Sequence, residues 1–243
     1  MQRTKIEWVK NENGSQGYSI NPVKGLCPIA CKDKQGKEYC YARRMYKRFK
    51  WNPEIRFDDS VFFDLARIKP SRIFIGSTIE LFGEWVKDEW LQFTFDICRA
   101  YSHHTFIFLT RQPQNLFKWS PFPDNCWVGV TAIDAQTLNS GLYHLWDVKA
   151  KIKFVSIEPL LFWNPLFSQI VFPHHLNWLI IGQQTPVSAK TQPEIEWIWE
   201  IVEAADKAGI PVFLKDNLEG LFDYPLPEWA EEQTTFLRQE FPK

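Results

Sequence analysis

Short apolar segments alternate along the chain with longer polar or amphipathic ones. Each apolar segment is a nearly continuous run of β-branched, aromatic or aliphatic residues, which is typical of parallel strands buried on both faces. Six such runs predict strands, and a weaker run near the start predicts one more. The ranges are 72–78, 105–110, 127–132, 153–159, 178–183 and 211–216, with 18–23 as the weaker candidate.

Two of the segments between these strands have helical periodicity and signals for a helix start. Polar residues that accept hydrogen bonds from the first free N–H groups favour the beginning of a helix. We expect helices over 88–101, with Asp88 as N-cap, and over 193–208, with Thr191 and Glu194 as a capping box.

The order of strand, helix and strand recurs without an internal repeat or an obvious linker. This order predicts an α/β fold with parallel strands and right-handed crossovers. Six or seven strands favour a partial or full (β/α) barrel, with a doubly wound open sheet as the alternative. We expect residues 1–243 to form a single domain, with 217–243 as a C-terminal extension.

Polar residues follow each of the six stronger predicted strands. Parallel strands bring their carboxyl ends to one face, where α/β barrels carry their active sites. One such residue is usually a turn or cap residue, but six successive cases favour a polar mouth. The residues are Ser77, Thr78 and Glu80; Thr110 and Arg111; Thr131 and Asp134; Glu158; Gln183 and Gln184; and Lys215, Asp216 and Asn217.

Composition narrows the function classes. The net charge is −1, which argues against a protein whose whole surface attracts polyanions. The 12 Trp and 20 Phe residues predict a core rich in rings, with base stacking on a few of them as the alternative. The first residues contain no long apolar run, so we expect no signal peptide, no membrane span and a cytoplasmic location.

Three of the five cysteines lie in the stretch "GLCPIACKDKQGKEYC", at Cys27, Cys31 and Cys40. Its loop composition argues against incidental core thiols. Structural zinc would need a fourth ligand, which only Cys98 or Cys126 could supply as a thiolate. An iron–sulfur cubane on three thiolates leaves one iron open, and that iron can bind S-adenosylmethionine for radical chemistry. The position after the first strand favours this third interpretation.

The segments "INPVKGLC" and "CYARRM" resemble the opening of the phage Gp37/Gp68-like family (DUF5131), which is similar to radical S-adenosylmethionine proteins. Later segments match in the same order, over about residues 4 to 217: "IFIGSTIELFGEWV", "HTFIFLTRQPQNL", "CWVGVTA", "KFVSIEPLL", "NWLIIGQQ" and "AGIPVFLKD". The chain departs from the family pattern in its second cysteine gap, which has eight residues, "KDKQGKEY".

The resemblance implies a radical-SAM-like barrel with a [4Fe–4S] cluster on Cys27, Cys31 and Cys40. It also implies S-adenosylmethionine on the open iron and an electron donor such as flavodoxin or ferredoxin. The residues that the resemblance implies for cofactor binding flank the last cysteine or follow strands. They are Tyr39, Tyr41, Gly76, Ser77, Thr78, Thr110, Arg111, Thr131, Glu158 and Gln183.

The substrate is not identified by the sequence. Residues 41–50 carry five basic side chains, which predict either a solvated helix face or a phosphate-binding one. We expect substrate contacts from Arg43, Arg44, Glu80 and Lys215. Arg111 and Glu158 are candidates to hold the substrate or the aminocarboxylate of S-adenosylmethionine, and the alternative for both is a salt bridge that lines the barrel interior. The alternative function is a non-catalytic barrel protein with a structural metal site, zinc or an inert cluster, that binds nucleic acid through residues 41–50.

Overall fold

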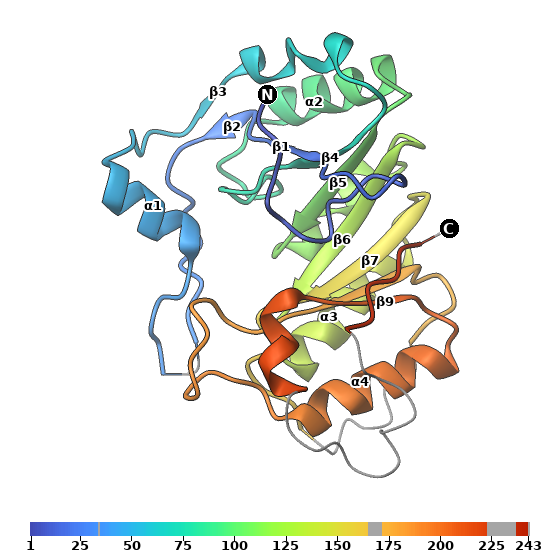
Figure 1. Ribbon diagram of the computed structural model, residues 1–243. Helices are drawn as coiled ribbons and strands as arrows, with labels where there is room; N and C mark the ends of the chain where they lie inside the picture. Colours follow the sequence, from blue (N-terminus) through green and yellow to red (C-terminus); the bar gives the residue numbers. More distant parts are fainter. Residues whose placement is uncertain (34, 165–171, 223–236, 243) are drawn as a thin grey trace. The chain divides into compact units, whose positions relative to one another are not determined.

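The chain forms helices and parallel strands, as Figure 1 shows. The computed structural model describes residues 1–33, 35–164, 172–222 and 237–242. Contacts within the chain divide it into two compact units. The first is Met1–Val130 with Asp147–Lys151, and the second is Thr131–Trp146 with Ile152–Lys243.

Four parallel strands carry the first unit. They lie side by side in chain order, and each neighbouring pair is parallel. The predicted strand at 72–78 ends early because Gly76 turns the chain with a φ of +84°. The strands are β1 (Tyr18–Ile20), β4 (Arg72–Ile75), β5 (Thr105–Thr110) and β6 (Cys126–Ala132), the last running into the second unit.

Helix α2 (Asp88–Ala100) packs its apolar side on the strands of this unit. The ring of Phe95 lies 5.3 Å from that of Phe108 on β5, measured between centroids. The predicted N-cap is wrong by one residue, because Lys87 occupies that position and Asp88 is the first helical residue. A carboxylate in the first turn still favours the helix through the partial positive charge at its N-terminus.

Smaller elements complete the first unit and extend into the second. Helix α1 (Tyr41–Phe49) lies close to the predicted 41–50. Strands β2 (Val23–Lys24) and β3 (Arg56–Phe57) pair in antiparallel fashion. Short 3₁₀ helices cover Asp59–Phe62, Leu65–Arg67, Pro113–Asn115, Phe117–Trp119 and Asp216–Leu221.

The second unit has three further strands that also pair in parallel and in chain order. A doubly wound sheet would reverse its strand order at a switch point, and neither unit does so. The α/β class with parallel strands is confirmed in each unit for the residues that the structure describes, whereas the barrel stays a prediction. The strands are β7 (Ile152–Ile157), β8 (Trp178–Ile181) and β9 (Val212–Leu214).

The described part of the second unit includes two α-helices. Helix α3 (Ala135–Trp146) was not predicted, and the Asp134 carboxylate accepts a hydrogen bond from the Thr137 N–H (2.8 Å) at its start. Helix α4 (Ile195–Lys207) begins later than predicted. The capping box is wrong, because Glu194 is itself the N-cap without a side-chain cap bond.

The last described residues add a cover to strand β9. The N–H of Leu214 donates to the carbonyl of Arg238 (2.7 Å), and the N–H of Glu240 donates to Val212 (3.0 Å). The ring of Phe241 packs on Trp178 with centroids 5.5 Å apart. A covered edge strand offers fewer free backbone groups to other chains. Residues 223–236 and 243 of the expected extension lie outside the described residues.

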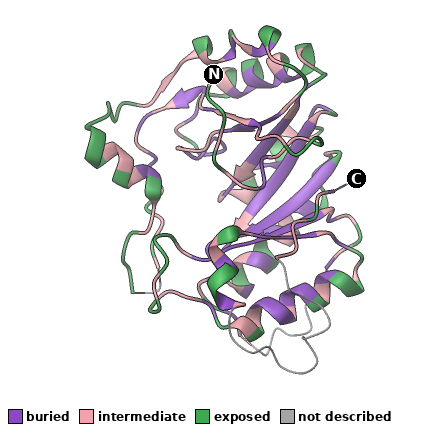
Figure 2. Ribbon diagram, viewed as in Figure 1, coloured by how far each residue is buried: buried purple, intermediate pink, exposed green. Residues whose placement is uncertain are grey.

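No helix within the described ranges has the length and apolar character that crossing a membrane requires. The strands form the buried interior of each unit, as the burial colours of Figure 2 show. The expectation of a single domain stays a prediction.

The buried ring of Phe108 gives a test of the core. We expect Phe108→Ala to lower the free energy of unfolding by about 3–5 kcal/mol, because it removes a fully buried ring and leaves a cavity. Phe117, which is 66% exposed, is the matched control, and Phe117→Ala should change the free energy by about 0.5 kcal/mol or less. Urea unfolding of both variants measures the difference, and equal losses would contradict this assignment of the core.

Candidate functional site

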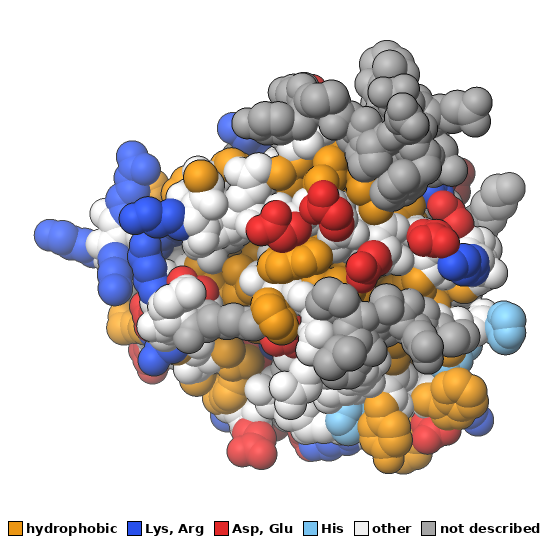
Figure 3. Space-filling model, turned by 90° about the horizontal axis from the view of Figure 1, so that it is seen from below, with side chains coloured by type: hydrophobic (Ala, Val, Ile, Leu, Met, Phe, Trp, Pro, Cys, Tyr) orange, Lys and Arg blue, Asp and Glu red, His pale blue; other side chains and the backbone are white. Residues whose placement is uncertain are grey.

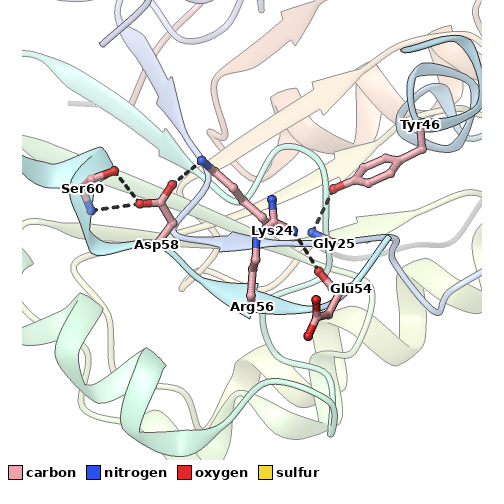
Figure 4. Close-up of polar contacts among 7 residues, drawn as sticks. All are labelled: Lys24, Gly25, Tyr46, Glu54, Arg56, Asp58 and Ser60. Carbon is pink, nitrogen blue, oxygen red and sulfur yellow. Dashed lines mark hydrogen bonds and ion pairs between the residues drawn. The ribbon is translucent and has the colours of Figure 1, made fainter. Parts of the chain in front are cut away.

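The backbone just ahead of the first cysteine is fixed by α1 and by the segment that follows it, as Figure 4 shows. Lys24 forms an ion pair with Asp58, and the N–H of Gly25 donates to the Tyr46 hydroxyl (2.8 Å). Gly25 has a φ of +126°, and a Cβ there would lie 2.7 Å from the carbonyl oxygen of Glu54. Only glycine fits such a position, so this residue is required where the cysteine loop begins.

The eight residues between the second and third cysteines fold back on themselves. Lys32 and Glu38 form an antiparallel bridge, and the N–H of Tyr39 donates to the carbonyl of Cys31 (3.1 Å). The insertion is therefore a small hairpin with Cys31 and Cys40 at its base. The departure from the family spacing lengthens the loop but still returns the third cysteine to the second.

Cys40 and Cys31 form a hydrogen-bonded thiol pair. The bond from Cys31, helped by the nearby backbone amides of Arg43 and Ala42, lowers the pKa of Cys40 to about 6. The same bond and burial raise the pKa of Cys31, so the shared proton stays on Cys31. Cys40 is the N-cap of α1, and a helix N-terminus stabilises a thiolate.

Cys27 is buried, and burial raises the pKa of its thiol. The charge of Cys40 adds to this shift, and Cys27 in turn raises the pKa of Cys31, so each of the three thiols affects another. Within the described ranges, however, no group of three or more His, Cys, Asp or Glu side chains is arranged to hold a metal ion.

A buried carboxylate organises the end of β5. Glu80 is 8% exposed and accepts hydrogen bonds from the Thr110 hydroxyl (2.6 Å), the Arg111 N–H (2.7 Å) and the Phe82 N–H (2.9 Å). Burial raises the pKa of Glu80, and these three bonds oppose the shift. Glu80 thus holds the strand end in place, while its contact with a substrate stays a prediction.

Arg111 connects this strand end to the cysteine hairpin. Its guanidinium donates to the Tyr39 hydroxyl (2.7 Å) and lies over the Tyr39 ring, 5.6 Å from the centroid. Burial is the main cause that raises the pKa of Tyr39 to about 12. The positive charge of Arg111 favours the thiolate of Cys31. The structure therefore brings together two predicted cofactor residues and a predicted metal ligand that are far apart in sequence.

A second cluster joins the ends of β1 and β4. The Asn21 carboxamide accepts from the Thr78 N–H (3.1 Å) and bonds to the Ser77 hydroxyl (3.3 Å). The Tyr41 hydroxyl donates to the Ser77 carbonyl, and the N–H of Gly76 donates to Ile20 (2.9 Å). Asn21 was missed as a site residue, although it directly follows the first strand within "INPVKGLC".

In the second unit, the predicted strand-end residues also meet. Glu158, after β7, forms an ion pair with Lys215, after β9. A Cβ on Gly182 would lie 2.8 Å from Cδ of Lys215, so the glycine leaves room for this pair. Gln183 and Asn217 exchange hydrogen bonds, with the Asn217 amide donating to the Gln183 carbonyl (2.8 Å). The cofactor and substrate roles of these residues stay predictions, as does that of the half-buried Thr131 on β6.

The remaining basic and thiol candidates have three different environments: one supports the cysteine loop, one is exposed and two are buried. Arg43 donates to the carbonyl of Cys27 (2.7 Å) and so braces the cysteine loop, whereas Arg44 is exposed on α1. Cys98 and Cys126 are buried and hydrogen-bonded to each other. This pairing argues against either of them as a fourth ligand beside the three-cysteine loop.

The thiol pair predicts a distinct pH dependence of alkylation in the metal-free protein. A lowered pKa means that the thiolate of Cys40 is present above about pH 6, so its reaction with iodoacetamide should reach half its maximal rate there. Cys40→Ser should bring the pKa of Cys31 down towards its usual value. Peptide mass spectrometry measures both, with buried Cys98 as an unreactive control, and an ordinary pKa near 9 for Cys40 would contradict the pairing.

Comparison with known proteins gives a single result. Searches of curated proteins and of solved structures found no match. A family model described as "Protein of unknown function (DUF5131)" matches residues 3–222, which include the cysteine hairpin and every strand. The chain therefore belongs to the DUF5131 family.

Proposed function

We propose that the protein is a radical S-adenosylmethionine enzyme with a [4Fe–4S] cluster on Cys27, Cys31 and Cys40. The hairpin that returns Cys40 to Cys31 is the observation that carries the proposal. Three thiols that influence one another's charge suit a cubane with one open iron. When bound, such a cluster supplies the electron for reductive cleavage of S-adenosylmethionine, and a flavodoxin or ferredoxin would deliver that electron.

The surroundings of the thiols suit ligation chemically. Cysteine binds metal as a thiolate, so a ligand whose pKa lies below neutral pH loses its proton at little cost. Cys40 meets this condition through its place at the start of α1. Arg111 favours the charged form of Cys31, and Arg43 fixes the carbonyl of Cys27. The charged form is thus favoured overall at Cys40, whereas Arg111 only partly opposes the rise in the pKa of Cys31.

Arg111 is the residue that we propose for the carboxylate of S-adenosylmethionine. Its guanidinium lies next to the cysteine hairpin through Tyr39. In the described part of the chain, no carboxylate lies within ion-pair distance of the Arg111 guanidinium. Guanidinium groups bind carboxylates through paired N–H donors. Glu80 fixes the Arg111 backbone, and so it determines where this donor group stands.

No specific observation favours a structural zinc site over the cluster. Zinc in a structural site takes four protein ligands in a closed tetrahedron. Cys98 and Cys126 are the other thiols of the chain, and they bond to each other in the interior of the first unit. Among the described residues, three thiols with no fourth thiol beside them suit an open site.

Iron binding tests the cluster directly. Anaerobic reconstitution of the wild type should give about four irons per chain and, with dithionite and S-adenosylmethionine, 5′-deoxyadenosine. Cys27→Ala, Cys31→Ala and Cys40→Ala should each lose most of the iron and all of the product, whereas Cys98→Ala should keep both. Stoichiometric zinc without iron in anaerobically purified protein would overturn the proposal.

Arg111→Met tests the second part of the proposal. We expect this variant to keep its iron but to bind S-adenosylmethionine at least about tenfold more weakly, because it loses a charge-assisted contact. Tyr39→Phe is the control, since it removes only the hydroxyl that accepts from Arg111. Calorimetric titration of the reconstituted proteins measures the affinities, and an unchanged affinity in Arg111→Met would exclude this role.

A further inference from the structure

We propose that the end of α1 and the residue pair after it form a binding surface for single-stranded nucleic acid. The surface combines exposed cations with exposed rings, and it lies outside the thiol site. Binding to it requires neither iron nor S-adenosylmethionine. We call it the α1 surface, and it consists of Lys47, Arg48, Phe49, Lys50 and Trp51.

The charged side chains of the α1 surface are all positive. Residues 41–53 contain no Asp or Glu. Lys47, Arg48 and Lys50 are exposed, and none of them lies within ion-pair distance of a carboxylate among the residues that the structure describes. Figure 3 shows Lys and Arg side chains gathered at its left, the side on which α1 lies in Figure 1. Unpaired cations close together attract phosphates even when the whole chain is nearly neutral.

The α1 surface also carries two exposed aromatic rings. Phe49 is 50% exposed and Trp51 is 42% exposed. Their planes are nearly parallel, at 21°, with centroids 5.6 Å apart. The guanidinium of Arg48 lies 5.3 Å from the centroid of Phe49. Stacked rings beside cations are the arrangement on which unpaired bases stack while their phosphates meet the positive charges.

Tyr46 on α1, which also fixes the start of the cysteine loop, holds Trp51 in place. The N–H of Trp51 donates to the carbonyl of Tyr46 (3.3 Å), and the Tyr46 ring meets the Trp51 ring edge-on at 5.3 Å. Tyr46 in turn binds the N–H of Gly25, as Figure 4 shows. Lys50 closes the helix in the left-handed conformation, with φ of 50°. A fixed platform loses little entropy when a base stacks on it.

A lipid surface fits these observations less well. Helices that lie in a membrane interface bury a broad apolar face. In α1, the residues turned towards the protein are the buried Ala42 and the half-buried Arg43, Met45 and Tyr46. The exposed side is therefore mostly cationic, with its two rings stacked on each other near the helix end. Charge complementarity and stacking together favour a polynucleotide.

The position of α1 also points to a substrate class for the enzyme, and this step rests on the proposed function. The helix begins at Cys40 and ends at the α1 surface, nine residues later. A single strand bound there would lie about 14 Å along the helix axis from Cys40, at the other end of a nine-residue helix. Single-stranded nucleic acid is then the substrate class of the enzyme, and the binding step and the chemical step are separable by experiment.

Binding is tested with a fluorescein-labelled oligo(dT) and by anisotropy at several salt concentrations. We expect salt-dependent binding to the wild type and weaker binding to a duplex of the same length. Lys47→Gln/Arg48→Gln should reduce the slope of log K against log[salt] by roughly 1.4, at roughly 0.7 for each lost phosphate contact with a single strand. Trp51→Ala should weaken binding by about 5- to 150-fold, the range for loss of one stacked base.

Matched controls keep these effects specific. Lys118→Gln/Lys207→Gln removes two exposed charges elsewhere, and Trp146→Ala removes a ring that is 64% exposed on α3; both should bind as the wild type does. Thermal unfolding checks that each variant is folded, and should Trp51→Ala not fold, the salt slope decides. Cys31→Ala should bind oligo(dT) normally even where it loses iron, so failure of the cluster leaves this test intact.

Three outcomes would overturn the inference. The first is no binding of oligo(dT) at low salt, and the second is equal loss in the control variants. The third is that binding which depends on Lys47 and Arg48 occurs to phosphatidylserine vesicles but not to oligo(dT).

An oligo(U) probe should bind like oligo(dT), because the cations of the α1 surface contact only phosphates and its ring faces contact only bases.

Discussion

The cysteine site depends on one backbone contact, the hydrogen bond from the N–H of Tyr39 to the carbonyl of Cys31. It closes the hairpin and sets Cys40 beside Cys31 at the start of α1. The pKa of Cys40, the position of Tyr39 under Arg111 and the direction in which α1 leaves the loop all follow from this closure. A surface hairpin of this length costs little loop-closure entropy, so the insertion still allows Cys40 to lie beside Cys31.

Much of the fold was predictable because parallel strands buried on both faces have no polar alternation to obscure them. The seven described parallel strands lie within or next to the predicted ranges, whereas the short antiparallel strand β3 was not predicted. Their ends were less predictable, since Gly76 stops β4 through its backbone conformation and not through its hydrophobicity. Helix α3 was missed because Asp134 was interpreted as a strand-end residue, whereas its carboxylate caps a helix that starts one residue later.

The candidate site was predictable in its residue types but not in its pairings. Arg111 and Tyr39 are 72 positions apart, and their contact depends on where tertiary structure puts the hairpin and β5. Glu80 shows a related limit. A carboxylate after a strand predicts a ligand contact, but a buried one must first satisfy its own hydrogen bonds. Here three donors on Phe82, Thr110 and Arg111 do so, and the charge becomes part of the support for Arg111.

The two ends of the nine-residue helix α1 favour opposite charges. Its N-terminus carries the partial positive charge of free N–H groups, which favours the thiolate of Cys40. Its last turn carries Lys47 and Arg48, which complement the partial negative charge at the C-terminus. Both ends therefore lie where the helix dipole favours their charge. A nearly neutral protein can in this way keep a thiol that favours its charged form and a cationic surface on a single short helix.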